Sequence, residues 1–469
     1  MRVGIIGAGA TGLAAAYKLS KAGHQAVVFE RAPFLGGQAS TFDVAGARLE
    51  RGYHHIFTND TDILDLAKEI GLGNRMCFFE SKVGTLYDGK IYNFVTPTDL
   101  LKFTPLNFIN RVRLGMVTLL IRRIKDWHKL ESITASEWLR KYAGSSAYDV
   151  FWGPMLRGKF GEGNYHRVTM AWVWGKINTR FASRNRGVGK EMLGYPIGSF
   201  GEIFDTLAER IAERGSDIHL STLATRVEIE GDTAIGLRVT HSPATWTSPQ
   251  PLALADENPS YEKEFHNDAN EPTFEPFDAV IATTPSYAFE KLVPSLPSDY
   301  GRKLVDISYM AAVLIILVLN RPLSHVYWLN VADRSIPFVG VIEQTNMVSP
   351  EHYGGKHIVY LSNYLSTAHP LYNLEHQGLL DEYVPHLRKI NPDFDTSWIE
   401  ESYYHRVDAA QPIIGVDYSA RMPDHRTPID RLYLANTTQV YPEDRGTNYS
   451  VRMGTRVAQM VMDDLRSPK

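Results

Sequence analysis

The sequence has little cysteine and no long apolar run, and both shortages exclude classes of protein. Cys77 is the one cysteine in 469 residues, so neither an intrachain disulfide nor a zinc cluster built on thiolates can form. Such a chain is typical of a reducing compartment, and we expect a cytoplasmic protein. The longest apolar run, 310–319, is too short to cross a bilayer and predicts a buried strand. Glycines interrupt the apolar N-terminus, which therefore predicts a strand and turn, not a secretory signal.

Acidic residues are scarce in one segment. Residues 101–190 contain 17 Lys and Arg against 5 Asp and Glu, a formal net charge of +12. The whole chain has a net charge of −4, so the remaining residues together carry −16. A basic segment in a mildly acidic protein favours an anionic partner: a phosphate, a carboxylate or an anionic membrane surface. The alternative is a solvated face that pairs with acids elsewhere in the fold. We expect a small-molecule substrate and no nucleic acid, and the sequence leaves the oligomeric state open.

The N-terminal region has the alternation of a doubly wound sheet. Residues 2–6 predict a buried strand, 10–22 a helix and 25–30 a second strand, with a glycine turn after the first strand. This order begins an α/β sheet of Rossmann type. Further strands are predicted at 218–220, 226–230, 234–240, 277–283, 311–319, 357–362 and 431–435, and further helices at 108–128, 134–142, 200–214, 379–390 and 448–465.

The turn after the first strand has the glycine spacing of a dinucleotide-binding loop. In such a loop the first glycine forms a tight turn, the second lets the backbone approach a diphosphate, and the third lets the helix pack closely on the strand. The helix N-terminus adds free N–H groups and a positive dipole end. Glu30, after the second strand, can accept both ribose hydroxyls of an adenosine. The predicted contacts are Gly7, Gly9, Ala10, Thr11, Gly12, Glu30 and Arg31.

A glycine doublet, Gly36-Gly37, follows closely and allows a second backbone approach to the same diphosphate. Residues 7–41 resemble the signature of the superfamily of flavin-containing amine oxidases, phytoene desaturases and protoporphyrinogen oxidase-like proteins. The resemblance implies FAD as the cofactor. It also implies non-covalent binding, because Cys77 is far from the C-terminal segment where covalently flavinylated members carry their cysteine. The family usually has Arg where this chain has Gln38, although UDP-galactopyranose mutases of the same superfamily also lack it.

The resemblance continues over nearly the whole chain. Residues 52–57 resemble the family's Gly-x-His-x-Phe stretch beside the flavin ring, and 195–200 resemble its Tyr-Pro-x-Gly-Gly segment. Residues 278–285 and 432–436 resemble two later strands of the family. A helix that begins near residue 447 would point its positive N-terminus at the flavin pyrimidine and stabilise the anionic reduced flavin. The further cofactor contacts that this implies are Gln38, Gly52, Tyr53, His54, Val227, Asn436, Thr447, Asn448 and Tyr449.

Two interleaved domains follow from the length and the resemblance. The implied FAD-binding domain comprises residues 1–79, 195–290 and 411–469. A mixed helical and sheet substrate domain comprises 80–194 and 291–410. Residues 241–276, with seven acids, one Lys and six prolines, predict an extended acidic hairpin insertion in the FAD-binding domain.

The chemistry of the site is less determined than its cofactor. His54, His55 and Tyr449 are candidates for catalysis, although a histidine packed beside the cofactor without a chemical role is an equal interpretation. Arg157 and Lys159, set among glycines and apolar residues, suit anion binding, with a surface loop as the alternative. No Ser/His/Asp triad, paired carboxylates or metal-ligand cluster is evident in the sequence.

The expected function is FAD-dependent removal of hydride from a C–H bond of an apolar or anionic small molecule. One alternative is a redox-neutral flavin-dependent isomerase, because residues 55–59 resemble a stretch of UDP-galactopyranose mutase. Another is a non-catalytic carrier of the Rab GDP-dissociation-inhibitor type, which shares the fold without FAD. The intact glycine and Glu30 motifs argue against the carrier.

Residues 108–128 combine an apolar and a cationic face. Such a helix can lie in a membrane interface, and relatives with lipid-soluble substrates collect them from membranes. We therefore consider peripheral contact with an anionic membrane. The alternative is that the apolar face packs against the rest of its domain.

Overall fold

The computed structural model describes residues 1–184, 190–241 and 271–466. Its first layer is a parallel sheet of largely buried, apolar strands, in the order β10-β2-β1-β14-β20. Helices cover one face and a three-stranded sheet with two short helices covers the other. The strands are β1 (Arg2–Ile6), β2 (Gln25–Phe29), β10 (Asp217–His219), β14 (Ala279–Ala282) and β20 (Leu432–Leu434). The covering elements are α1 (Ala10–Lys21), α9 (Ser199–Ala212), α15 (Thr447–Arg466), β11 (Thr222–Glu230), β12 (Thr233–His241), β13 (Thr273–Pro276), α11 (Ser286–Leu292) and α12 (Ser298–Val305).

A seven-stranded sheet forms the second layer, with strand order β19-β15-β18-β17-β16-β7-β8. The long apolar run is its strand β15, which is buried from Met310 to Leu319, as predicted. The helix predicted at 379–390 is shorter than expected, because Pro385 interrupts the pattern and α13 (His376–Tyr383) gives way to a 3-10 turn. The strands are β7 (Val83–Tyr87), β8 (Lys90–Asn93), β15 (Tyr309–Leu319), β16 (Trp328–Val331), β17 (Gly340–Glu343), β18 (His357–Leu365) and β19 (Ile399–Pro412).

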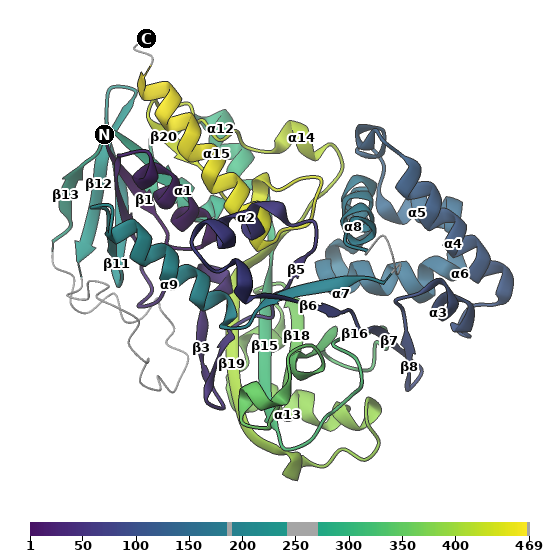
Figure 1. Cartoon of the computed structure of the whole chain (residues 1–469). Helices are drawn as coiled ribbons and strands as arrows, with labels where there is room; N and C mark the ends of the chain where they lie inside the picture. The colour runs from purple at the N-terminus through teal and green to yellow at the C-terminus, as the bar shows by residue number, and fades with distance from the viewer. Residues whose placement is uncertain (185–189, 242–270, 467–469) are drawn as a thin grey trace.

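A helical lobe with its own apolar core forms the third part. It lies on the right in Figure 1, beside both sheets. Helix α7 joins it to the second sheet by packing on β16 and β18. The helix predicted at 108–128 ends at Arg123, where Ile124 turns to extended geometry. The helices are α3 (Pro97–Lys102), α4 (Phe108–Arg123), α5 (Ala135–Ala143), α6 (Ser145–Ala147), α7 (Gly153–Asn164) and α8 (Met170–Ala182).

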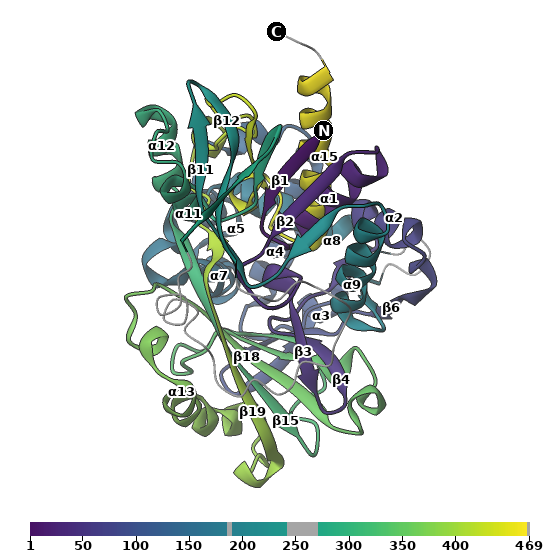
Figure 2. The same cartoon turned by 90° about the vertical axis from the view of Figure 1, so that its left-hand side faces the viewer.

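Short elements connect the three parts, and Figure 2 shows β3 and β4 between the parallel sheet and the second sheet. The predicted acidic hairpin insertion begins and ends on paired strands, since β12 and β13 are antiparallel neighbours. Residues 242–270 of that insertion lie outside the described residues. The connecting elements are β3 (Thr41–Val44), β4 (Ala47–Glu50), β5 (Ile56–Phe57), α2 (Thr61–Glu69), β6 (Met76–Glu80), β9 (Met192–Pro196) and α14 (Tyr418–Arg421).

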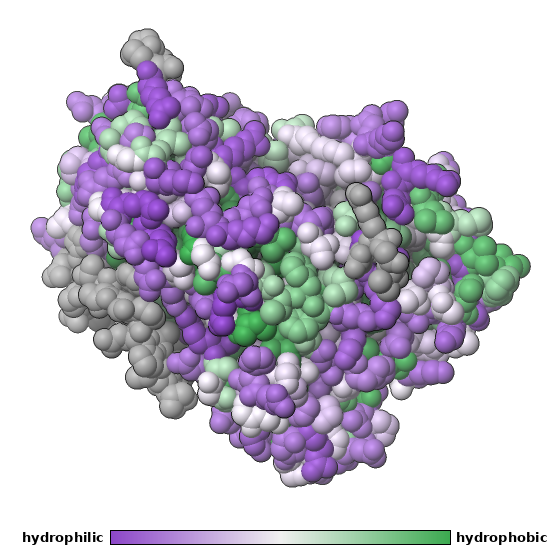
Figure 3. All heavy atoms as spheres, in the orientation of Figure 1, coloured by the Kyte–Doolittle hydropathy of each residue, from purple (hydrophilic) through white to green (hydrophobic). Residues whose placement is uncertain are grey.

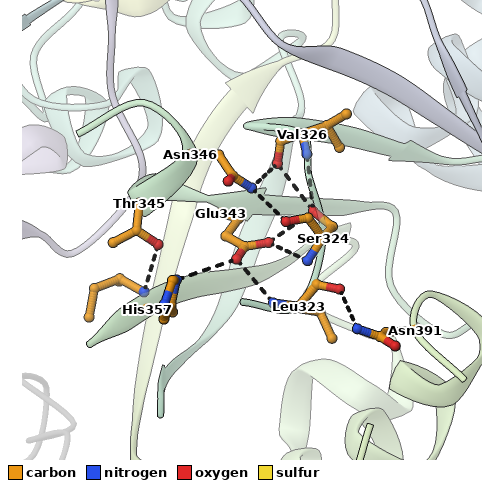
Figure 4. Close-up of polar contacts among 9 residues, drawn as sticks. Leu323, Ser324, Val326, Glu343, Thr345, Asn346, His357 and Asn391 are labelled. Carbon is orange, nitrogen blue, oxygen red and sulfur yellow. Dashed lines mark hydrogen bonds and ion pairs between the residues drawn. The ribbon is translucent and has the colours of Figure 1, made fainter. Parts of the chain in front are cut away.

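One buried carboxylate stabilises the second sheet at the end of β17. Glu343, at the end of β17, is fully buried and accepts hydrogen bonds from the Leu323 and Ser324 amides and from the Ser324 hydroxyl (Figure 4). Burial raises the pKa of Glu343 to about 7. These neighbours satisfy the carboxylate internally, which indicates that it fixes the loop before β16.

Candidate functional site

Two glycines of the first loop are required by the protein itself. Gly7 has φ +104°, and a Cβ there would lie 2.4 Å from Thr283 Oγ1. A Cβ on Gly12 would lie 1.9 Å from the Gly7 carbonyl oxygen, so only glycine lets α1 start this close to β1. Both requirements come from packing and backbone geometry, and they would hold without any ligand.

Gly9 is different, because neither its backbone nor its neighbours require glycine. Its φ of −75° and ψ of 178° suit any residue. An added Cβ would meet nothing nearer than Gly37 Cα at 3.8 Å and Gly36 O at 4.0 Å. Gly52 has similar room, with the Gln38 carbonyl oxygen at 3.9 Å as the nearest atom. The glycines at these two positions are therefore explained by something other than the protein's own packing.

The glycine doublet Gly36-Gly37 joins the first loop to form one cradle. The Gly36 amide donates to the Ala8 carbonyl oxygen at 2.9 Å, and a Cβ on Gly37 would lie 3.2 Å from Gly9 Cα. Helix α1 begins at Ala10 and Thr11 without a side-chain cap and without an acid in its first turn. Its first N–H groups and positive dipole end therefore suit an anion. Bare backbone beside an uncapped helix N-terminus fits the diphosphate of a dinucleotide.

Glu30 lies at the edge of this cradle. Its carboxylate accepts hydrogen bonds from the Ala8 amide at 2.8 Å and from the Ala32 amide at 2.9 Å. Burial raises the pKa of Glu30, and these bonds partly offset that effect. The Glu30 carbonyl oxygen accepts from the Thr222 amide, which brings the start of β11 to the same edge, while Val227, farther along β11, is buried in a core cluster with Phe29. Arg31 is exposed beside them.

A cavity continues from the cradle to the second sheet. Three of its lining residues, Gly52, Tyr53 and His54, come from the loop before β5, and Gln38 follows the glycine doublet. The opposite wall comes from β15, β18, β19 and the start of the C-terminal segment. The remaining lining residues are Ala312, Leu314, Ser362, Tyr364, Val407, Ala410 and Arg445.

Arg445 is a site residue that the sequence motifs did not reveal. Its guanidinium donates to Gln411 Oε1 at 3.0 Å, to Gln38 Oε1 at 3.3 Å and to the Tyr364 hydroxyl at 2.9 Å. Arg445 therefore places a cation beside the side chain of Gln38, at the position where the amine oxidase superfamily usually has Arg. Its place directly before the predicted helix start at Gly446-Thr447 was the only signal in the sequence.

A partly buried cluster of charged side chains lies next to Tyr364. The Asp444 carboxylate contacts Lys159 Nζ at 3.2 Å and Lys176 Nζ at 3.0 Å. Burial alone would raise the pKa of Tyr364, but Lys159 and Arg445 outweigh it and lower that pKa to about 8. Burial also raises the pKa of Asp444, and the two lysines reverse that shift and hold it below its ordinary value. Beside the cavity residue Tyr364, three cations, Lys159, Lys176 and Arg445, therefore meet one acid, Asp444.

Both candidate histidines are neutral near pH 7. Burial lowers the pKa of His54 to about 4, and burial followed by Arg180 lowers the pKa of His55 to about 3. His54 Nδ1 lies 2.6 Å from the Gly52 carbonyl oxygen and must donate to it, which leaves Nε2 as an acceptor in the cavity wall. His55 Nδ1 lies 3.2 Å from the Tyr327 hydroxyl.

Several other predicted residues are engaged within the protein. Asn436 donates to the Thr284 carbonyl oxygen and accepts from Thr438, so its side chain fixes the turn after β20. Asn448 accepts from the Ile63 amide at the start of α2. The Tyr449 hydroxyl lies 3.4 Å from Thr179 Oγ1, and Thr447 is buried at the start of α15.

Arg157 and Lys159 diverge, although both lie on α7. Lys159 belongs to the cationic cluster, whereas Arg157 donates to the Ala332 carbonyl oxygen and lies 3.6 Å from Glu162. No group of three or more potential metal-binding side chains converges within 1–184, 190–241 and 271–466. Over the same residues, no helix combines the length and apolar character needed to cross a membrane.

Comparisons with known proteins agree with this geometry. Residues 10–462 match the model of the family described as flavin containing amine oxidoreductase. A 15-cis-phytoene desaturase of Synechococcus elongatus is 31% identical over 157 residues, which are 30% of this chain and 33% of that protein. Among solved structures, reduced UDP-galactopyranose mutase has a TM-score of 0.73 at 15% identity, covering 98% of this chain and 95% of that one. Putrescine oxidase bound to putrescine has a TM-score of 0.69 at 15% identity, covering 99% of both chains. The alignments with the curated desaturases span about a third of those proteins or less.

Proposed function

This chain belongs to the flavin containing amine oxidoreductase family, and we propose that it is an FAD-dependent oxidoreductase that removes hydride from a C–H bond of an anionic small molecule. The cradle formed by Gly9 and Gly37 at the N-terminus of α1 supports a dinucleotide cofactor. When bound, FAD supplies the acceptor for the hydride. The protein supplies the position of the substrate, the exclusion of water and the electric field.

The observation that carries the substrate class is the excess of positive charge at the end of the cavity. Lys159, Lys176, Arg180 and Arg445 face two acids, Asp444 and Glu191. Lys159, Lys176 and Arg180 also lower the pKa of His55, after burial, so all three act on the same region. A cationic amine would be repelled here, whereas a carboxylate or phosphate would be attracted.

Individual residues have distinct roles under this proposal. Gln38 and Arg445 would bind the cofactor where the cradle opens into the cavity, and the positive charge of Arg445 would favour a reduced, anionic flavin. His54 Nε2 would accept a hydrogen bond or a proton from the substrate, because its Nδ1 proton is held by the Gly52 carbonyl. Lys159 and Lys176 would orient the substrate's anionic group.

The test is anaerobic mixing of the purified flavoprotein with matched carboxylates, phosphates, amines and neutral amides, with flavin bleaching as the readout. We expect bleaching by anionic compounds and by none of their amine counterparts. Bleaching by amines alone would refute the substrate class. Turnover only after chemical reduction of the flavin, without net redox change, would favour the isomerase alternative.

A further inference from the structure

Helix α4 has a second apolar face that the fold does not use. The first apolar face of α4, formed by Leu114, Val117 and Ile121, is buried in the core of the helical lobe. On the other side of the same helix, Phe108 is 64% exposed and Ile109 is 76% exposed. Burial of the first face already holds the helix in place, so the exposed face is not needed for folding.

The exposed apolar residues form one continuous surface. They repeat at intervals of three and four residues along α4, and Tyr142 from the end of α5 extends them. Figure 3 shows this hydrophobic surface at the right-hand edge of the molecule, over the helices labelled α4 and α6 in Figure 1. Its members, which we call the α4 surface, are Phe108, Ile109, Val112, Met116, Leu119, Leu120 and Tyr142.

Cations surround the α4 surface, and α4 itself contains four arginines and no acid. Arg113 donates to the carbonyl oxygens of Lys141 and Tyr142, which fixes its charge beside the apolar residues. Lys102, Arg123 and Lys141 are exposed, and none of them forms an ion pair with any described residue. Exposed apolar side chains bordered by exposed cations suit an anionic bilayer, which presents negatively charged headgroups above an apolar acyl layer.

We propose that the α4 surface docks this protein peripherally on an anionic lipid bilayer. The apolar residues would enter the acyl boundary, while Lys102, Arg123 and Lys141 would contact the headgroup phosphates. The surface belongs to the helical lobe and contains no residue of the cradle or the cavity. The proposal therefore stands or falls independently of the proposed function.

The test is co-sedimentation of the purified flavoprotein with vesicles of phosphatidylcholine mixed with phosphatidylglycerol, and with vesicles of phosphatidylcholine alone. We expect sedimentation with the anionic vesicles at low salt and little with the neutral ones. Binding should weaken as salt rises, because exposed charges are screened over about 8–10 Å at physiological ionic strength. Protein that stays in the supernatant with anionic vesicles at low salt would overturn the proposal.

Matched variants distinguish vesicle binding through the α4 surface from nonspecific binding through any exposed apolar residue. Ile109→Asp and Met116→Asp should each weaken vesicle binding by about tenfold or more, since each removes an apolar side chain that would enter the bilayer and adds a negative charge that the anionic lipids repel. Val305→Asp is the control, because Val305 is 54% exposed on α12, far from α4 in sequence, and this variant should bind like the wild type. Far-UV circular dichroism and flavin content should be unchanged in all three. Equal binding by all variants would overturn the proposal, as would self-association that Ile109→Asp abolishes without any vesicle binding.

Discussion

Replacement of Gly9 by alanine separates cofactor binding from folding. The backbone at Gly9 has φ −75° and ψ 178°, which alanine adopts without strain. The new Cβ would lie 3.8 Å from Gly37 Cα, an ordinary contact. Alanine should therefore leave the stability of the apoprotein unchanged or raise it by about 0.4–1 kcal/mol, because the unfolded chain loses freedom.

The same methyl group should strongly weaken FAD binding. It would occupy the space in front of the cradle and push the diphosphate away from the first N–H groups of α1. Each hydrogen bond from an N–H group to a charged phosphate contributes about 1.5–3 kcal/mol. Loss of one such bond should raise the Kd for FAD roughly 10- to 150-fold.

The assay combines titration of the apoprotein with FAD, followed by quenching of flavin fluorescence, and thermal unfolding of the apoprotein. Gly301→Ala is the matched control, because Gly301 lies in α12 with nothing within 4 Å of its added Cβ, and it should bind FAD normally. Gly12→Ala should lose stability, since its Cβ would lie 1.9 Å from the Gly7 carbonyl oxygen. Wild-type FAD affinity in Gly9→Ala, or a loss of stability as large as in Gly12→Ala, would refute this reasoning.

Three further predictions concern other parts of the structure. Glu30→Gln removes the charged acceptor expected to bind the ribose hydroxyls and places an NH₂ group against the Ala8 or Ala32 amide, so it should cost roughly 1.5–3 kcal/mol of FAD binding. Unchanged FAD retention on dialysis would contradict a role for Glu30 in binding the ribose. Lys176→Met should raise KM for an anionic substrate more than it lowers kcat, with the surface variant Lys356→Met as the control; equal kinetics of both variants would argue against the cationic cluster as a binding site. Burial lowers the pKa of His405 to about 3, below its value near 6.5 in the unfolded chain, so stability that depends on neutral His405 is present above pH 6.5 and lost as the pH falls below it. In urea unfolding at pH 7, 6 and 5, the free energy of unfolding of His405→Phe relative to the wild type should therefore rise by up to about 1.4 kcal/mol per pH unit as the pH falls. A difference between the two proteins that stays constant with pH would contradict this.

The elements that sequence predicts well are those whose pattern is local. The glycine turn, the helix at 10–22 and the buried strand at 310–319 each follow from neighbouring residues, and the structure has them close to the expected bounds. Element ends were less predictable. Helix α4 is shorter than expected because extended geometry begins at Ile124, and α13 is shorter because of Pro385.

The parts of the site that sequence did not reveal are made by long-range contacts. Gln38 and Arg445 are separated by 407 residues along the chain, and no local pattern relates them. Lys159, Lys176 and Asp444 likewise meet only after α7, α8 and the C-terminal segment pack together. The sequence indicated Lys159 as an anion-binding candidate but could not separate it from Arg157, since the direction of each side chain depends on tertiary packing.

The most direct test of the central claim is the flavin content of the purified protein. We expect a yellow protein with a flavin absorbance spectrum, and acid precipitation should release FAD into the supernatant in an amount equimolar with the protein. Chromatography of that supernatant identifies the flavin. A colourless protein that also fails to bind added FAD would show that the chain is not a flavoprotein, and flavin that stays in the precipitate would contradict non-covalent binding.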